Sequence, residues 1–149
     1  MSCYLLDVNV LIALTWPTHV HHVAARRWFD RESRGGWATC PLTQLGFVRV
    51  SSNPSAIRDA VRPAEAVAML ERLKALPGHY FWADEVAVTL AGPFASLSLV
   101  GHRQVTDAYL LALAQHHGGK LATLDRGVPE LIAEHDARSE WVELIPTEG

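Results

Sequence analysis

Short apolar runs alternate with longer amphipathic stretches along this chain. The short runs cover residues 3–8, 37–42, 79–83, 121–124 and 141–145. Their length and apolar character are typical of buried strands, whereas the stretches between them carry apolar residues three and four positions apart, as amphipathic helices do. Strands that alternate with helices predict an α/β fold with a mainly parallel sheet flanked by helices.

Residues that start or end helices delimit the amphipathic stretches. The helices predicted in this way cover residues 9–14, 18–34, 44–50, 63–76 and 107–116. Thr43 is a candidate cap for the third helix, and Pro63 suits the first turn of the fourth. The Gly118-Gly119 pair ends the last one. Residues 86–90 and 95–100 are equally readable as helices or as a helix with a strand-like turn.

Length and composition indicate one globular domain over residues 1–149. Of its 149 residues, 49% are hydrophobic and 19% are charged, which is enough for a sizeable core. No apolar run approaches the roughly 18–20 residues of a membrane span, and the first residues do not resemble a secretion signal. We therefore expect a cytoplasmic protein that does not contact a membrane.

The charge of the chain limits how it can bind nucleic acid. Its net charge is −3, which argues against a protein that coats nucleic acid through a large basic surface. Eleven of the thirteen cationic residues are Arg, and Arg can bind a phosphate with two hydrogen bonds. Any contact with nucleic acid should therefore be local.

Three aspartates stand beside predicted strand ends or helix starts. Asp7 follows the first apolar run, Asp125 follows the run at 121–124, and Asp107 begins the last predicted helix. The carboxyl ends of parallel strands share one edge of the sheet, where ligands bind. Carboxylates that meet there raise each other's pKa unless a cation neutralises them, and oxygen ligands suit Mg²⁺ or Mn²⁺. The pattern predicts a metal-dependent phosphodiesterase site, although a lone Asp at such a position more often serves a turn or a cap.

Four ordered segments resemble the PIN-domain nucleases, specifically the VapC toxins of bacterial toxin–antitoxin pairs. They are Leu5-Leu6-Asp7-Val8-Asn9-Val10-Leu11, Thr43-Gln44-Leu45-Gly46-Phe47-Val48-Arg49, Thr106-Asp107-Ala108-Tyr109-Leu110 and Ala122-Thr123-Leu124-Asp125. The resemblance spans nearly the whole chain in the order of the family. It implies a single PIN domain, an Mg²⁺- or Mn²⁺-dependent endoribonuclease that cuts RNA, a homodimer or a higher toxin–antitoxin assembly, and neutralisation by a small VapB-type antitoxin.

The resemblance also assigns roles to individual residues. Those that match the acidic metal ligands of the family are Asp7, Asp107 and Asp125. Those that match the polar residues around the ligands are Asn9, Thr106 and Thr123. Thr106 is expected to cap its helix or to orient Asp107.

Two positions depart from the family pattern. Gln44 stands where Glu is usual, and Val128 stands where many PIN domains carry a further acid. A Gln oxygen can accept a hydrogen bond from a metal-bound water, but it cannot neutralise a cation. The expected site therefore has three carboxylates and holds one ion rather than two.

Basic residues beside these segments are candidates for contact with RNA phosphates. They are Arg49, His102, Arg103 and Arg126. A simpler interpretation of Arg49 is that it forms an ion pair with an acid.

Other functions stay open. A site weakened by Gln44 would leave a module that binds RNA or a partner protein without cutting. The Asp7-Val8-Asn9 segment also resembles the start of aspartyl-nucleophile phosphatases, but Asn9 replaces their second acid, and no Lys follows Lys120. A phosphate-accepting response regulator would need paired early acids and a late Lys, and the order of residues in this chain does not match that pattern.

Several other residues with chemical potential have simpler explanations. Cys3 and Cys40 lack CxxC spacing and are expected to be buried free thiols. The histidine groups at residues 19–22 and 116–117 suggest zinc ligands, but solvated surface is the simpler interpretation. The tryptophans are expected to pack in the core, with Trp16 the one candidate for stacking on a base.

Overall fold

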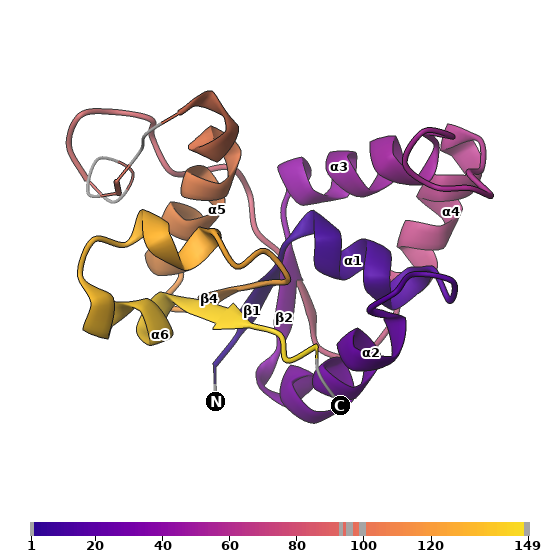
Figure 1. Cartoon of the computed structure of the whole chain (residues 1–149), viewed down its shortest axis with the longest axis horizontal. Helices are drawn as coiled ribbons and strands as arrows, with labels where there is room; N and C mark the ends of the chain where they lie inside the picture. The colour runs from indigo at the N-terminus through magenta and orange to yellow at the C-terminus, as the bar shows by residue number, and fades with distance from the viewer. Residues whose placement is uncertain (1, 93, 95–96, 99–100, 148–149) are drawn as a thin grey trace.

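A parallel five-stranded sheet forms the centre of the computed structural model, which describes residues 2–92, 94, 97–98 and 101–147 (Figure 1). The strands are β1 (Tyr4–Leu6), β2 (Trp37–Thr39), β3 (His79–Phe81), β4 (Lys120–Thr123) and β5 (Val142–Leu144). They lie in the order β3-β2-β1-β4-β5, and every neighbouring pair is parallel. The predicted α/β class is confirmed.

Helices cover both faces of this sheet (Figure 1). The α-helices are α1 (Val8–Thr15), α2 (His22–Glu32), α3 (Pro41–Ser51), α4 (Pro63–Lys74), α5 (Val105–His116) and α6 (Arg138–Trp141). The short 3-10 helices are η1 (Ser33–Gly35), η3 (His102–Gln104), η4 (Val128–Leu131) and η5 (His135–Ala137). Helices α1 to α4 lie on one side of the sheet, and α5 and α6 lie on the other.

The central strand β1 contributes side chains to two separate hydrophobic cores. Tyr4 and Leu6 pack in the cluster under α1, α2 and α4, whereas Leu5 packs in the cluster under α5. Successive side chains of a strand point to opposite faces, so a strand that is buried on both sides must be apolar at every position. This requirement explains the uninterrupted apolar run at the start of the chain.

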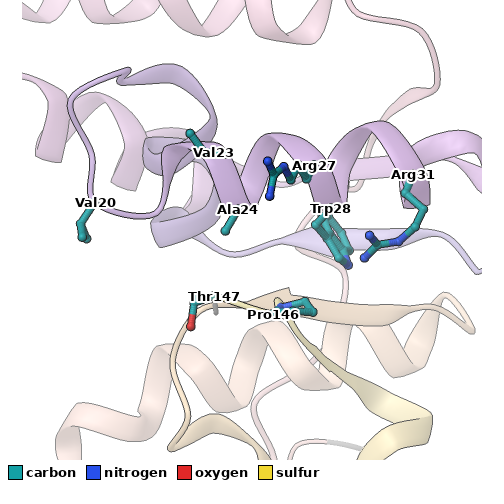
Figure 2. A pocket seen from close by; sticks show the side chains of 8 residues that line it. All are labelled: Val20, Val23, Ala24, Arg27, Trp28, Arg31, Pro146 and Thr147. Carbon is teal, nitrogen blue, oxygen red and sulfur yellow. The ribbon is translucent and has the colours of Figure 1, made fainter. Parts of the chain in front are cut away.

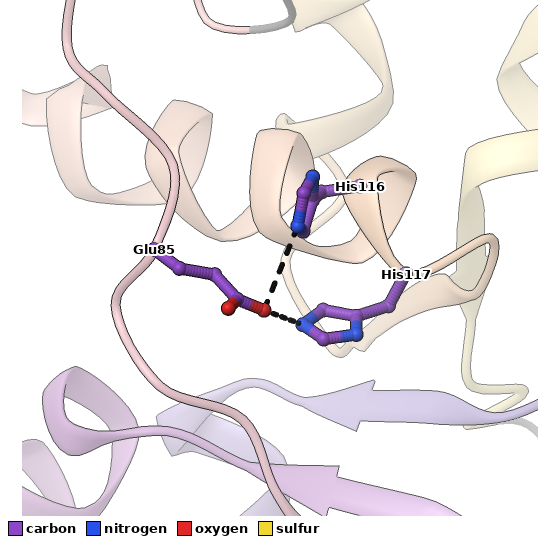
Figure 3. A group of neighbouring side chains, drawn as sticks. All are labelled: Glu85, His116 and His117. Atoms are coloured by element: carbon purple, nitrogen blue, oxygen red, sulfur yellow. Dashed lines mark ion pairs between the residues drawn. The ribbon is translucent and has the colours of Figure 1, made fainter.

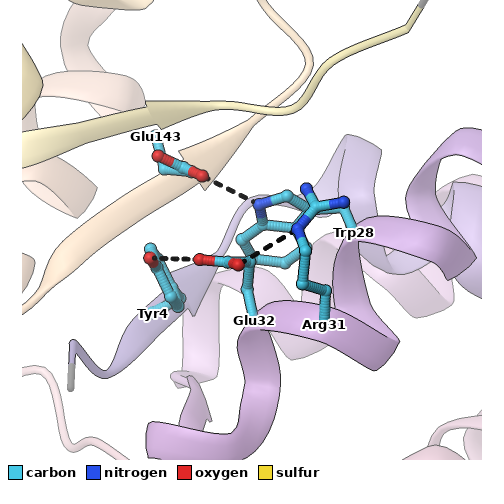
Figure 4. Close-up of polar contacts among 5 residues, drawn as sticks. All are labelled: Tyr4, Trp28, Arg31, Glu32 and Glu143. Atoms are coloured by element: carbon cyan, nitrogen blue, oxygen red, sulfur yellow. Dashed lines mark hydrogen bonds and ion pairs between the residues drawn. The ribbon is translucent and has the colours of Figure 1, made fainter. Parts of the chain in front are cut away.

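Polar contacts join the edge strand β5 to the helix layer (Figure 4). Trp28 of α2 donates its indole N–H to Glu143 of β5 at 3.0 Å. Tyr4 donates to Glu32 at 3.3 Å, and Glu32 also accepts from Arg31 at 3.1 Å. The first contact connects β5 with α2, and the second connects β1 with the end of α2.

Helix starts differ most from the prediction at α3 and α2. Helix α3 begins at Pro41 rather than after Thr43, because Cys40 occupies the N-cap position and the Thr43 hydroxyl accepts from the Cys40 N–H at 3.0 Å from within the first turn. Helix α2 begins at His22 rather than near Thr18, and Val20 is 85% exposed.

The remaining boundaries are close to the prediction. Trp141 belongs to α6, so β5 is shorter than predicted at its start. Residues 86–90 form neither helix nor strand, and most of residues 95–100 lie outside the described part of the chain. Cys3 and Cys40 are free, as predicted, although Cys3 is only partly buried.

Helices α1 and α3 approach each other closely beside the sheet. A Cβ atom at Gly46 would lie only 2.5 Å from the side chain of Val8, so only glycine fits at this crossing. Val8 is the first residue of α1 and follows Asp7, so this contact helps to set the position of that aspartate. None of the helices in the described ranges is long and apolar enough to cross a membrane.

Candidate active site

The sheet topology places Asp7 and Asp125 at the same edge of the molecule. Asp7 follows β1 directly, and Asp125 lies two residues beyond β4, the strand that pairs with β1. Asp107 reaches the same place from the first turn of α5. All three aspartates line one pocket of about 400 Å³. The other residues that line it are Val8, Asn9, Ile12, His19, Val50, Ala56 and Ile57.

The hydroxyl of Thr123 organises the centre of this pocket. It donates to Asp7 Oδ2 at 2.8 Å and accepts from Asn9 Nδ2 at 3.2 Å and from the Asp125 N–H at 3.1 Å. Asn9 in turn accepts from the Leu124 N–H at 3.1 Å. One hydroxyl offers one donor and two acceptor sites, so the hydrogen-bonding capacity of Thr123 is fully used.

Two of the aspartates also have local structural roles. Asp7 Oδ1 accepts from the Val8 N–H at 2.8 Å and caps α1, and Asp125 Oδ1 accepts from the Gly127 N–H at 2.8 Å in a turn. The Asp107 carboxylate accepts no hydrogen bond from any described residue. The helix cap and the turn therefore orient two of the carboxylates in the pocket, whereas the third has no such partner among the described residues.

Burial and neighbouring charge raise the pKa of two of the aspartates, Asp107 and Asp7. Burial, followed by the charges of Asp7 and Asp125, raises the pKa of Asp107 to about 6. Burial also raises the pKa of Asp7, against the hydrogen bonds from Thr123 and Val8, and the charge of Asp125 adds to the rise. Gathered carboxylates that share a site cannot all ionise without a compensating positive charge.

The donor set fits a hard divalent cation. The lining residues include three carboxylates and no Lys or Arg. Carboxylate oxygens are the ligands that Mg²⁺ and Mn²⁺ prefer. The uncompensated charge of the pocket therefore suits one such ion.

Gln44 and Thr106 do not line this pocket. The Gln44 amide donates to the hydroxyl of Thr39 at 2.9 Å, and that hydroxyl also lies 2.7 Å from Nε2 of His79. Thr106 is exposed in the first turn of α5, and Gln104 is the N-cap residue of this helix. The prediction that Thr106 caps its helix is wrong, because the helix starts one residue before it.

The basic candidates also lie outside the pocket. Arg49, His102, Arg103 and Arg126 are all exposed. Arg126 lines a different hollow, beside Leu144 and the segment after β5. Arg49 forms no ion pair with any acid that the structure describes, so both roles considered for it stay predictions.

Sequence reasoning missed one basic residue that does line the pocket. His19, which we expected to be solvated surface, lines the aspartate pocket and also a neighbouring hollow of about 600 Å³. Its Nδ1 accepts from the His21 N–H at 3.0 Å, and burial together with the nearby His21 and His22 lowers its pKa. The only feature of the sequence that could have placed His19 at the pocket is its position in the loop that follows α1.

Trp16 does not serve as an exposed stacking platform. It is 8% exposed, and its indole N–H donates to Ser51 at 3.1 Å. Packing of α1 against α3 therefore explains this residue, as core packing explains Trp28 and Trp37.

A separate hollow of about 370 Å³ lies between α2 and the segment after β5 (Figure 2). Arg27, Arg31 and the ring of Trp28 line it together with Pro146. It contains no carboxylate, so it lacks the oxygen ligands that the aspartate pocket offers a metal ion.

Comparison with known proteins gives consistent matches over most of the chain. The model of the PIN domain family matches residues 4–133. Ribonuclease VapC39 of Mycobacterium tuberculosis is 48% identical over 126 residues, which cover 85% of this chain and 91% of that protein. Ribonuclease VapC38 of the same organism is 51% identical over 124 residues, which cover 83% of this chain and 86% of that protein.

Solved structures show a similar fold. VapBC2 from Rickettsia felis, bound to a DNA fragment from its promoter, contains a chain with a TM-score of 0.62 and 11% identity, covering 97% of this chain and 99% of that chain. FitAcB from Neisseria gonorrhoeae contains one with a TM-score of 0.55 and 17% identity, covering 93% and 95%. At these identities the likeness concerns the fold alone.

Proposed function

The chain belongs to the PIN-domain family, and we propose that it is the toxin of a type II toxin–antitoxin pair, an endoribonuclease that hydrolyses RNA phosphodiester bonds with a divalent metal ion. The observation that carries this proposal is the convergence of Asp7, Asp107 and Asp125 on one pocket. The relatives named as VapC ribonucleases support the choice of RNA as substrate.

In this proposal the three aspartates hold one Mg²⁺ or Mn²⁺ ion. Such an ion, when bound, lowers the pKa of a water molecule and stabilises negative charge on a phosphate group. The chain contributes the positions of the ligands: Thr123 orients Asp7, and Asn9 holds Thr123. Because Gln44 supplies no charge, a single ion fits better than two.

The pocket also suits a small antitoxin. Ile12, Val50, Ala56 and Ile57 form an apolar wall beside the carboxylates. A VapB-type partner could bury an apolar segment there and place an Arg between the aspartates, where its charge would replace that of the metal. The same proposal includes a homodimer, alone or within a larger toxin–antitoxin assembly, that acts on RNA in the cytoplasm.

Gln44 gives one specific reason to consider a second function. It is neutral and its amide donates to Thr39, so it adds no fourth carboxylate to the three that line the pocket. A pocket weakened in this way would bind RNA or a partner without cutting. The phosphatase alternative is weaker, because both oxygens of Asp7 already accept hydrogen bonds and the residue is 6% exposed, which is poor placement for a nucleophile.

The test is RNA cleavage by the purified chain, freed of any partner. A broad pool of structured RNA is incubated with Mg²⁺, Mn²⁺ or EDTA, alongside the variant Asp7→Asn. An Asn oxygen can still cap α1, so this variant should fold. The exposed Asp136 provides a matched control, Asp136→Asn. Metal-dependent cleavage lost only in Asp7→Asn supports the nuclease, whereas no cleavage by the wild type in either metal supports the binding module.

A further inference from the structure

Three side chains at the far end of α5 form a cluster that the proposed nuclease does not use. Glu85 comes from the connection between β3 and α5, His116 is the last residue of α5, and His117 is its C-cap (Figure 3). We propose that these residues form a second metal site, specific for a transition-metal ion of the Zn²⁺ class.

The spacing of the ligand atoms is close to that of a tetrahedral site. Oε1 of Glu85 lies 2.9 Å from Nε2 of His117 and 3.5 Å from Nε2 of His116. All three ligand atoms lie within 4.8 Å of one another. Zinc bonds of about 2.0–2.1 Å in a tetrahedron place neighbouring ligand atoms about 3.3 Å apart. Only small side-chain movements would bring the three atoms to this geometry.

The ligands are partly fixed before any metal binds. The ring of His117 stacks on Trp82, with centroids 4.1 Å apart and planes 10° from parallel. His116 and His117 meet edge to face, with centroids 5.1 Å apart. The N–H of Val86, the residue after Glu85, donates to the hydroxyl of Tyr109 on α5 at 3.3 Å. These contacts lower the entropic cost of assembling the site.

The chemistry of the cluster selects the class of ion. Two imidazoles and one carboxylate suit Zn²⁺, Ni²⁺ or Cu²⁺, whereas Mg²⁺ prefers oxygen ligands alone. The C-terminal end of a helix carries partial negative charge, which favours a cation beside His116. The side chains of Glu85, His116 and His117 are 47%, 46% and 24% exposed, so an ion can enter, and water can take the fourth position.

A bound ion would fasten the connection between β3 and α5 to the C-terminal end of that helix. Residues 82–92 of this connection form no helix or strand. Asp107 lies at the opposite end of α5, so the new site is separate from the aspartate pocket. We therefore expect the ion to stabilise the fold and not to take part in RNA cleavage.

The experiment is a Zn²⁺ titration of the full chain, purified without a histidine tag and carrying Asp7→Asn to weaken the aspartate pocket. We expect one equivalent of Zn²⁺ to bind and to raise the melting temperature. Glu85→Gln keeps the size of the side chain but removes its charge, and it should weaken binding at least tenfold. His116→Asn should do the same.

The control is His135→Asn, which removes an exposed histidine outside the cluster and should leave Zn²⁺ affinity unchanged. Stoichiometric binding that survives in both Glu85→Gln and His116→Asn would overturn the proposal, as would the absence of stoichiometric binding to the parent chain. RNA cleavage in Mg²⁺, measured with Asp7 restored, should be the same in Glu85→Gln and wild type. The zinc site and the nuclease can therefore fail independently.

Discussion

Removal of the charge on Asp107 should stabilise the metal-free protein. The folded chain holds this carboxyl with a pKa of about 6, above the ordinary value of 3.8, because of burial and the charges of Asp7 and Asp125. Ionisation of Asp107 therefore destabilises the folded state. The free energy of unfolding is at its highest below about pH 4, where the carboxyl is neutral in both states, and it falls as pH rises through about 6. Asp107→Asn mimics the neutral form at every pH.

The size of the gain follows from this difference in pKa. The difference corresponds to at most about 3 kcal/mol at neutral pH. Asp107 is only partly buried, and solvent screens its interactions, so about 1–2 kcal/mol is the expected increase in the free energy of unfolding.

The assay is urea unfolding in EDTA at pH 7.5 and at pH 4, followed by the same measurement with Mn²⁺ at pH 7.5. We expect Asp107→Asn to be more stable than wild type in EDTA at pH 7.5, and most of this gain to disappear at pH 4. With Mn²⁺ the order should reverse, because the ion stabilises the wild type by binding its carboxylates. A variant that is less stable than wild type in EDTA at pH 7.5 would refute the reasoning.

Three further substitutions test the surroundings of the pocket. Thr123→Val keeps the shape but removes the donor to Asp7, so urea unfolding should show a loss of about 1–3 kcal/mol; an unchanged stability would show that the hydroxyl does not hold the carboxylate. Gly46→Ala should cost about 1–3 kcal/mol through its clash with Val8, and adding Val8→Ala should recover part of the loss; no recovery would locate the strain elsewhere. Gln44→Glu adds a fourth negative charge and should tighten Mn²⁺ binding by about 1 kcal/mol, or about fivefold, in calorimetry; an unchanged affinity would show that this side chain does not act on the ion.

The strand ends and the aspartates that follow them could be predicted from the sequence. Apolar runs buried on both faces mark parallel strands, and neighbouring parallel strands bring their carboxyl ends together. Asp7 and Asp125 therefore fall beside each other because β1 pairs with β4. Asp107 was grouped with them because it begins a predicted helix, and it reaches the pocket from the first turn of α5.

Contacts made by loops and by residues distant in sequence could not be predicted. Thr123 and Asp7 are 116 residues apart, and nothing local shows that one hydroxyl serves Asp7, Asn9 and Asp125 together. His19 reaches the pocket from a loop whose path depends on packing. Helix starts were misplaced at α3 because a cysteine can occupy the N-cap position when a threonine three residues later supplies the hydrogen bond.

The central claim is that Asp7, Asp107 and Asp125 together bind the ion that RNA cleavage requires. The most direct measurement is the rate of RNA cleavage as a function of Mn²⁺ concentration, for the wild type, Asp7→Asn, Asp107→Asn and the control Asp136→Asn. We expect saturable cleavage by the wild type and the control, and rates at least 100-fold lower for the two pocket variants at every concentration. Cleavage that persists in EDTA, or that is equally fast in the pocket variants, would contradict the account.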